Sequence, residues 1–152
     1  MMASPRTAGI LAFVTALVAL FTQVLVHRMF SAKLINNFAF LVISLTMLGF
    51  AFSGVVLSVW RERCLEHLDD LVLGCAALFA LTLIGAAGLF FHAPPTAGWG
   101  VSRTGFVVTF LYCLPLSLLF AVPFVFCGLI LGSLLAAPGL ITRRIYFFDL
   151  VG

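Results

Sequence analysis

The sequence predicts an all-α integral membrane protein: a four-helix transmembrane bundle whose fourth helix is long and kinked. Hydrophobic residues make up 64% of the 152 residues and charged residues only 9%, against roughly 45–50% and 25% in soluble domains. The apolar residues gather in four long runs. So few polar residues cannot cover a soluble enzyme, and a net charge of +3 is too small for a nucleic-acid-binding face.

The first apolar run, residues 9–26, follows Arg6 and contains only three polar side chains. A cleaved signal peptide is the alternative, because a positive charge also precedes the apolar core of such peptides. That core is typically about 7–15 residues long and ends at a site of small residues. This run has 18 residues and ends before His27 and Arg28, so we expect a retained helix.

The next two runs cover residues 38–60 and 71–91, and neither contains a charge. Trp60 closes the first of them, where an indole ring suits the headgroup layer. Asp69–Asp70 precede the second, and acidic side chains favour a helix N-terminus. Pro94–Pro95 follow it and prevent its continuation. Both runs therefore predict membrane-spanning helices.

The fourth run, residues 106–137, would be about 48 Å long as a straight helix, which exceeds a hydrocarbon core of about 30 Å. Pro115 and Pro123 lie inside it. We expect a kink near one of them, or an interfacial helix that leads into a span from about residue 116. Residues 145–152 are too few to span and are expected to begin a further, truncated segment. The whole chain, 1–152, is then one transmembrane domain.

The positions of Lys and Arg predict the orientation of these helices. Five of the eight fall on one side of the membrane and three on the other if all four runs span. Five against three favours a multi-pass protein of the inner cell membrane with both termini in the cytoplasm. The five are Arg6, Arg61, Arg63, Arg143 and Arg144, and the three are Arg28, Lys33 and Arg103.

No apolar run contains an ionisable Asp, Glu, Lys, Arg or His. Because such residues mark proton relays and ion paths, their absence argues against a pump or an ion-coupled transporter. Gln23 is the strongest polar group in a run, and it is placed near a helix end. We expect it to bond a neighbouring helix or to reach the headgroups, and substrate binding is the alternative. The four cysteines are interpreted as small apolar residues, with redox or metal chemistry as the alternative.

Small residues recur at helical spacing in three runs, where they permit close approach of helix backbones. Packing within the chain is the favoured interpretation, and a homodimer seam through Gly128 and Gly132 is the alternative. The predicted packing residues are Gly49 and Ser53 in the second run, Gly85 and Gly88 in the third, and Gly128 and Gly132 in the fourth.

The segment 61–70 holds four of the five acidic residues. Glu66, His67, Asp69 and Asp70 are compatible with a metal or acid–base cluster, but a charged connector that extends a helix into water explains them more simply. The chain has no metalloprotease, serine hydrolase or nucleotide-binding motif. We therefore predict no catalytic residue, no metal site and no cofactor.

Three stretches share motifs with one family. Residues 38–54, from Phe-Ala-Phe-Leu to Phe-Ser-Gly, resemble an early membrane helix of the multispanning, spermidine synthase-like proteins of bacteria. Residues 123–128 resemble their later Pro-Phe-x-x-x-Gly segment. Residues 144–152, with Tyr146 and Asp149, resemble the Tyr-x-x-Asp-Leu-x-Gly that opens their next helix. The resemblance covers about residues 38–152, loosely between these stretches.

In that family, a membrane region is joined to a polyamine-synthase-like domain with the fold of the nucleoside-dependent methyltransferases. This chain lacks the glycine-rich nucleotide loop, the ribose-binding acid and the catalytic aspartate of that domain. The resemblance therefore implies a truncated, non-catalytic membrane region. It would anchor a cytoplasmic domain or form a path for a small cationic or amphipathic molecule.

Two other classes of function remain open. The first is a small four-span structural or assembly subunit. The second, a facilitator or channel, is disfavoured because the runs offer little polar lining. The expected partners are the lipid bilayer, a downstream synthase-like domain and a second copy of the chain, with no nucleic acid among them.

Overall fold

The computed structural model describes residues 5–33, 39–92, 103–137, 147 and 150, and it confirms the all-α class. All four helices are long and apolar enough to cross a bilayer, so the chain is a multi-pass membrane protein. The helices are α1 (Pro5–Lys33), α2 (Ala39–Glu66), α3 (Leu68–His92) and α4 (Arg103–Ala136).

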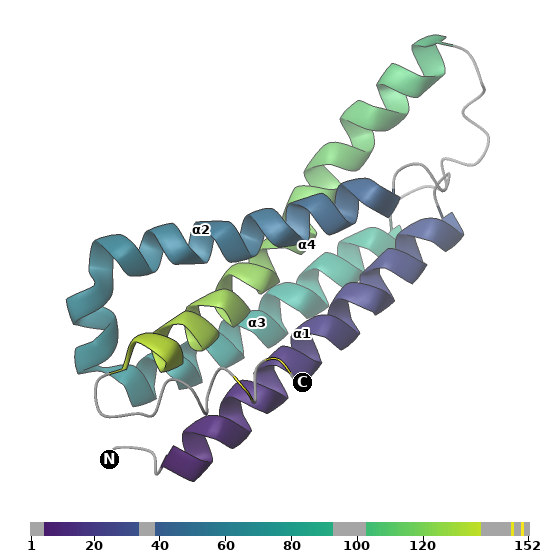
Figure 1. Cartoon of the computed structure of the whole chain (residues 1–152). Coiled ribbons are helices and arrows are strands. Elements are labelled where there is room, and N and C mark those ends of the chain that lie inside the picture. The colour runs from purple at the N-terminus through teal and green to yellow at the C-terminus, as the bar shows by residue number, and fades with distance from the viewer. Residues whose placement is uncertain (1–4, 34–38, 93–102, 138–146, 148–149, 151–152) are drawn as a thin grey trace.

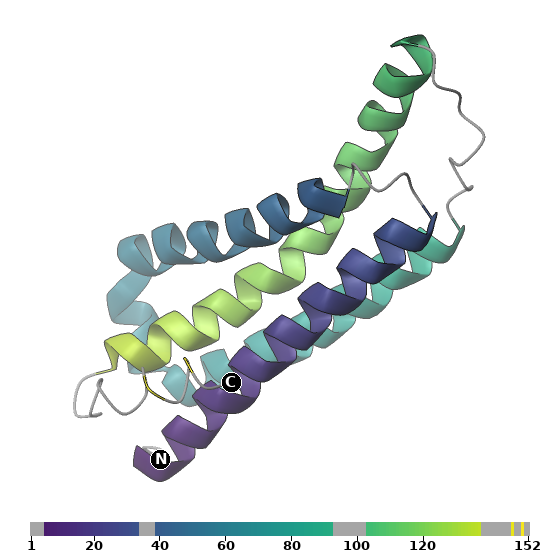
Figure 2. The ribbon, with the colours of Figure 1, turned by 45° about the vertical axis from the view of Figure 1, so that its right-hand side comes forward.

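The four helices run alternately up and down (Figure 1). The start of α1, the junction of α2 with α3 and the end of α4 lie at one end of the bundle. The end of α1, the start of α2 and the end of α3 lie at the other end (Figures 1 and 2). Arg61 and Arg63, next to the α2–α3 junction, are therefore on the opposite side from Arg28.

The central helix of the bundle is α4. It contacts each of the other three helices, and its contact with α2 is the most extensive. Half of the residues in its spanning window are buried, against 11% for α3. The helices are apolar on every side, because lipid is as apolar as the bundle interior. Hydropathy alone therefore does not mark the inward faces.

The prolines inside α4 do not end the helix. Pro115 and Pro123 both lie within its 34 residues, although each removes a backbone hydrogen bond and crowds the preceding turn. Figure 2 shows the first part of α4 rising at a different angle from the rest and extending beyond the bundle. The spanning part is Leu114–Ala136, close to the 116–137 expected from the sequence.

The one marked break in α2 is at Trp60, whose backbone is not helical (φ −115°, ψ 29°). The chain then turns and continues as helix to Glu66, whereas the sequence predicted a helix end at Trp60. The segment 61–70, expected as a charged connector that extends a helix, is mostly helical. His67 alone separates α2 from α3, and its carbonyl oxygen accepts a hydrogen bond of 2.9 Å from the backbone N–H of Leu71.

Two apolar clusters join α1 and α3 to α4. Phe30, Phe90 and Phe120 form the first, with ring centroids 4.9 Å apart for Phe30–Phe90, 5.4 Å for Phe30–Phe120 and 5.9 Å for Phe90–Phe120. The second, nearer the start of α1, contains small residues of α1 and Cys75 of α3 against Leu134 and its neighbours. Tilted and edge-on ring pairs of this kind are favourable contacts.

Candidate functional site

Small residues line the contact between α2 and α4. Thr46, Gly49 and Ser53 of α2 are all buried on one face of that helix. A Cβ built on Gly49 would lie 2.6 Å from the carbonyl oxygen of Ala121 and 3.1 Å from Cβ of Phe124. Because the nearest atom belongs to the backbone of α4, only glycine allows the two helices to come this close.

Gly128 makes the reciprocal contact from α4. A Cβ at this position would collide with the hydroxyl of Ser53 and would lie 2.8 Å from Ser53 Cβ. One turn later, a Cβ on Gly132 would lie 3.0 Å from a methyl group of Leu57. The face of α4 that carries the Gly-x-x-x-Gly motif is thus covered by α2 of the same chain. At Gly128 it is not available as the homodimer seam considered from the sequence.

The two predicted packing glycines of α3 have a different position. Gly85 and Gly88 are exposed, and a Cβ on either would meet no atom within 4 Å. The buried residues of α3 are instead Cys75, Ala86 and Phe90. The prediction that Gly85 and Gly88 pack against another helix therefore does not hold within this chain, because α3 turns a different face toward α4.

The hydroxyl groups at the α2–α4 contact are satisfied within their own helices. Thr46 Oγ1 donates to the carbonyl oxygen of Ile43 at 2.8 Å, and Ser53 Oγ donates to that of Phe50 at 2.6 Å. Such bonds to the preceding turn satisfy a small polar side chain without a partner from another helix. The close approach of α2 and α4 therefore rests on shape rather than on hydrogen bonds between these two hydroxyls and α4.

A groove of about 470 Å³ lies beside this contact, between α1, α2 and α4. Its walls are mostly apolar or glycine, and it is open to the surroundings, since Leu20 and Gly54 are exposed. The lining residues are Ala16, Ala19, Leu20 and Gln23 of α1, Phe50, Ser53, Gly54 and Leu57 of α2, and Gly128, Leu131 and Gly132 of α4. The groove thus brings together Gln23, Ser53, Gly128 and Gly132, which the sequence marked as a polar group within a span and as packing residues.

Gln23 is the strongest polar group in this groove. It is half-buried, and its side chain has no hydrogen-bond partner among the residues that the structure describes. Because α1 continues to Lys33, Gln23 lies about 15 Å from the end of the helix at 1.5 Å per residue. Gln23 therefore lies farther from the helix end than the apolar run indicated. Among the described residues it forms no hydrogen bond with a neighbouring helix, and its contact with the headgroups stays a prediction. Its carboxamide is available to a molecule in the groove.

Charged groups are absent from the lining of this groove. The acidic residues of the segment 61–70 lie elsewhere, and Glu66, His67, Asp69 and Asp70 are all exposed. Within the described ranges, no group of three His, Cys, Asp or Glu side chains is placed to hold a metal ion. The chemistry that the groove offers is therefore apolar contact together with hydrogen bonding to the carboxamide of Gln23 and to the hydroxyl oxygen of Ser53, which can still accept.

The residues with which α1 packs were not predicted from the sequence. A stripe of small side chains, Ala8, Ala12, Ala16 and Ala19, is buried against the other helices. Alanine is common on all sides of apolar helices, so only its spacing of three and four residues was available as evidence. The Phe30–Phe90–Phe120 cluster was missed as well, because nothing in one sequence pairs three rings from different helices.

Tyr146 and Asp149, which carry the family motif, lie outside the described residues, so their position is not part of this site. No known family model matches the chain, and no match is found among curated proteins or solved structures.

Proposed function

We propose that this chain is a non-catalytic membrane region that holds a small amphipathic molecule in the groove between α1, α2 and α4. The observation that carries the proposal is Gln23, a carboxamide in a mostly apolar groove that has no hydrogen-bond partner among the described residues. A polar group without a partner in an apolar environment costs about 1–3 kcal/mol. A ligand that supplies a hydrogen bond and otherwise makes apolar contacts removes that cost.

The volume and lining of the groove agree with this ligand class. A space of about 470 Å³ falls within the range of about 300–1,000 Å³ for small-molecule sites, which are mostly apolar with a few polar groups. A small cation alone is a poorer fit, because no carboxylate lines the groove. The amphipathic molecule considered from the sequence is therefore favoured over the cationic one.

Two variants test the proposal. Gln23→Leu removes the carboxamide at similar size, and Gly54→Leu fills the groove, since a Cβ on Gly54 would meet no atom within 4 Å. Gly85→Leu is the matched control, because it adds the same side chain at an equally open position of α3. Small molecules that purify with each protein are extracted and identified by mass spectrometry.

We expect at least one amphipathic molecule to be retained by the wild type and by Gly85→Leu, and to be lost from both groove variants. Equal retention by all four proteins would show that the groove does not hold it. If Gly54→Leu loses the molecule but Gln23→Leu retains it, the hydrogen bond to Gln23 is not the basis of recognition.

Membership in the spermidine synthase-like family is also a proposal, and it rests on the motif resemblance. One structural observation is consistent with it: two of the three similar stretches, residues 38–54 and 123–128, contact each other through Gly49, Ser53, Phe124 and Gly128. In this proposal, the chain anchors a downstream cytoplasmic domain. Sequencing the gene beyond codon 152 tests it: a continuing frame with a glycine-rich nucleotide loop is expected.

A four-span structural or assembly subunit is the second candidate, and the close α2–α4 contact favours it. Such a subunit needs a rigid scaffold and exposed apolar faces that fit partner helices. The two candidates predict different effects of groove variants, because a structural subunit should tolerate Gln23→Leu and Gly54→Leu without loss of function. Either way, we propose the inner membrane as its location, with both termini in the cytoplasm.

A further inference from the structure

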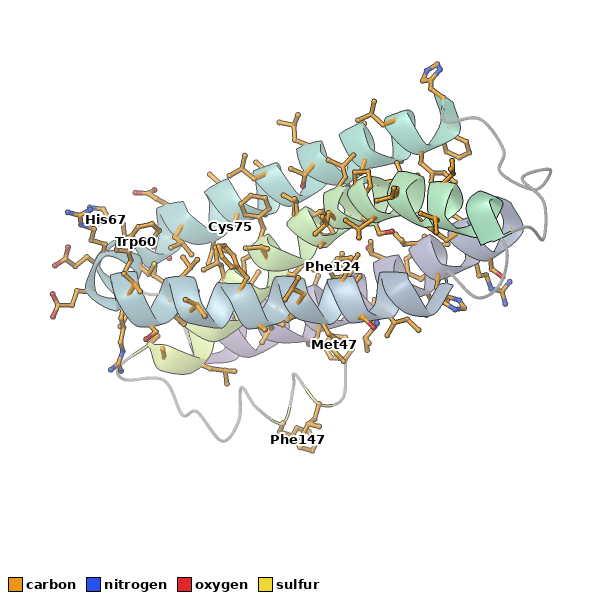
Figure 3. All side chains as sticks on the ribbon, turned by 90° about the horizontal axis from the view of Figure 1, so that it is seen from above. Met47, Trp60, His67, Cys75, Phe124 and Phe147 are labelled. Carbon is orange, nitrogen blue, oxygen red and sulfur yellow. The ribbon has the colours of Figure 1, made fainter. Side chains whose placement is uncertain are left out.

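The junction of α2 with α3 forms a sharp elbow. α2 breaks at Trp60, and His67 alone connects its end to Leu68 at the start of α3. Because α2 and α3 are both membrane-spanning helices, the elbow lies at the surface of the bilayer. Figure 3 shows Trp60 and His67 together at this end of the bundle, with Cys75 farther along α3.

A second hollow, of about 580 Å³, lies between the two arms of the elbow. Its outer end carries polar side chains, Arg63 and Asp70 among them, and its inner end is lined by Gly74 and Leu78. Asp70, Gly74 and Leu78 are four residues apart, so they follow one face of α3 from the bilayer surface toward the membrane interior. The hollow is therefore amphipathic along its length.

Gly74 lies at the inner end of the hollow. It is exposed, and a Cβ built on it would meet no atom within 4 Å. The surface beside it is therefore open to an apolar chain, which would also contact Leu78. Because this part of the hollow is at the depth of the lipid, its occupant is apolar there.

The outer end offers both signs of charge. Arg63 and Asp70 are exposed, and neither forms an ion pair with another residue in the described part of the chain. The segment 61–70 as a whole carries four carboxylates and two arginines. This excess of negative charge disfavours a purely anionic headgroup. A headgroup that has both a phosphate and an ammonium group matches the two signs at once.

We propose that the elbow binds one phospholipid with a primary ammonium headgroup, of the phosphatidylethanolamine class. Its phosphate pairs with the guanidinium of Arg63, which suits phosphate geometry. Its ammonium donates to the carboxylate of Asp70, and one acyl chain lies along Gly74 and Leu78. Trp60 borders the site at the headgroup level, where indole rings are favoured. The site is separate from the groove that contains Gln23.

The full chain, purified in detergent, is titrated with phosphatidylethanolamine, phosphatidylcholine and phosphatidylglycerol of the same acyl composition. Native mass spectrometry measures the number of bound lipids and their affinity. We expect one phosphatidylethanolamine to bind more tightly than either of the other lipids. Phosphatidylcholine has a quaternary ammonium that cannot donate a hydrogen bond to Asp70, and phosphatidylglycerol has no ammonium at all.

Three variants locate the bound lipid. Arg63→Gln and Asp70→Asn should each lower the affinity for phosphatidylethanolamine by up to about fivefold, the range for one exposed ion pair. Gly74→Leu should abolish the saturable binding, because it fills the seat of the acyl chain. The matched controls are Arg61→Gln, Glu62→Gln and Gly85→Leu, which are exposed and lie outside the hollow, and we expect them to bind as the wild type does.

Equal affinity for the three lipids would overturn the proposal. A preference for phosphatidylglycerol that survives Asp70→Asn would overturn the pairing with an ammonium group. Unchanged lipid binding by Gly74→Leu would show that the acyl chain does not lie along Gly74. A thermal melt of each variant accompanies the titration, so that loss of binding is compared only among folded proteins.

Discussion

Ser53 on α2 and Gly128 on α4 are in direct contact: a Cβ built on Gly128 would lie 2.8 Å from Cβ of Ser53. The contact fixes the distance between α4 and α2, the helix with which α4 makes its most extensive contact. Between membrane helices there is no hydrophobic driving force, so stability depends on close packing of this kind. A larger side chain at either position would therefore push α2 and α4 apart and lower the stability of the bundle.

Gly128→Leu should lower the stability of the bundle more than Leu131→Ala does. The added side chain has to push Ser53 away, whereas Leu131 is half-buried and its loss leaves the backbones in place. Overpacking of a well-packed contact costs about 1–3 kcal/mol, which corresponds to a shift of several degrees in Tm. A thermal melt in detergent measures it. Gly85→Leu is the control and should melt as the wild type does, whereas a wild-type Tm for Gly128→Leu would contradict the α2–α4 contact.

Gly49→Ala should destabilise the protein although it adds only one methyl group. That methyl would lie 2.6 Å from the carbonyl oxygen of Ala121, and a backbone atom cannot move without moving α4. Gly54→Ala, five residues later on the same helix, is the matched control, because a Cβ there would meet no atom within 4 Å. We expect Gly54→Ala to be neutral or slightly stabilising, since alanine favours helix. Equal Tm values for the two variants would show that α2 and α4 are farther apart than this.

The sequence predicted the four spans because membrane thickness sets the length of an apolar run. It did not predict the helix ends. α1 continues to Lys33 and α2 to Glu66, because polar residues at the membrane surface remain helical while hydropathy records only the lipid core. Gln23 therefore lies farther from the end of α1 than the apolar run indicated.

Which face of each helix points inward was only partly predictable. Gly49 and Gly128 were predicted from the spacing of small residues, and both pack at the α2–α4 contact. Gly85 and Gly88 have the same spacing on α3 but face outward. The spacing of small residues within one helix does not identify the neighbour, and lipid accepts glycine as readily as a protein contact does. The groove was not predictable, since it needs the relative positions of three helices.

The aromatic cluster supplies a pair of matched variants on neighbouring positions. Phe90 is buried against Phe30 and Phe120, whereas the side chain of Phe91 is 71% exposed. Phe90→Ala should lower Tm by several degrees, because it leaves a cavity among α1, α3 and α4. The loss in free energy of unfolding should be smaller than the roughly 3–5 kcal/mol that such a change costs in a soluble core, because lipid is as apolar as the core. Phe91→Ala should leave Tm within about one degree of the wild type. The reverse order would show that α3 is rotated about its axis.

The purified chain should neither bind a nucleoside cofactor nor transfer aminopropyl groups. The reason is the lack of a glycine-rich loop and of the acidic residues that such chemistry uses. Calorimetric titration with decarboxylated S-adenosylmethionine measures binding, and we expect no saturable heat. Saturable binding that Gln23→Leu removes would instead place a nucleoside in the groove and would contradict the proposal of an amphipathic ligand.

Both termini should face the cytoplasm. The start of α1, the α2–α3 elbow and the end of α4 share one end of the bundle (Figure 1), so the orientation of one fixes that of the others. Arg61 and Arg63 lie at this end, and positively charged residues near span ends are retained in the cytoplasm. A reporter that is active only in the cytoplasm is fused after residue 152 or inserted after residue 98, between α3 and α4. We expect activity from the first fusion and none from the second. The reverse pattern would invert the protein in the membrane and would move the elbow, with its hollow, to the outer leaflet. Activity from both fusions would show that α4, the described helix between the two sites, does not cross the membrane.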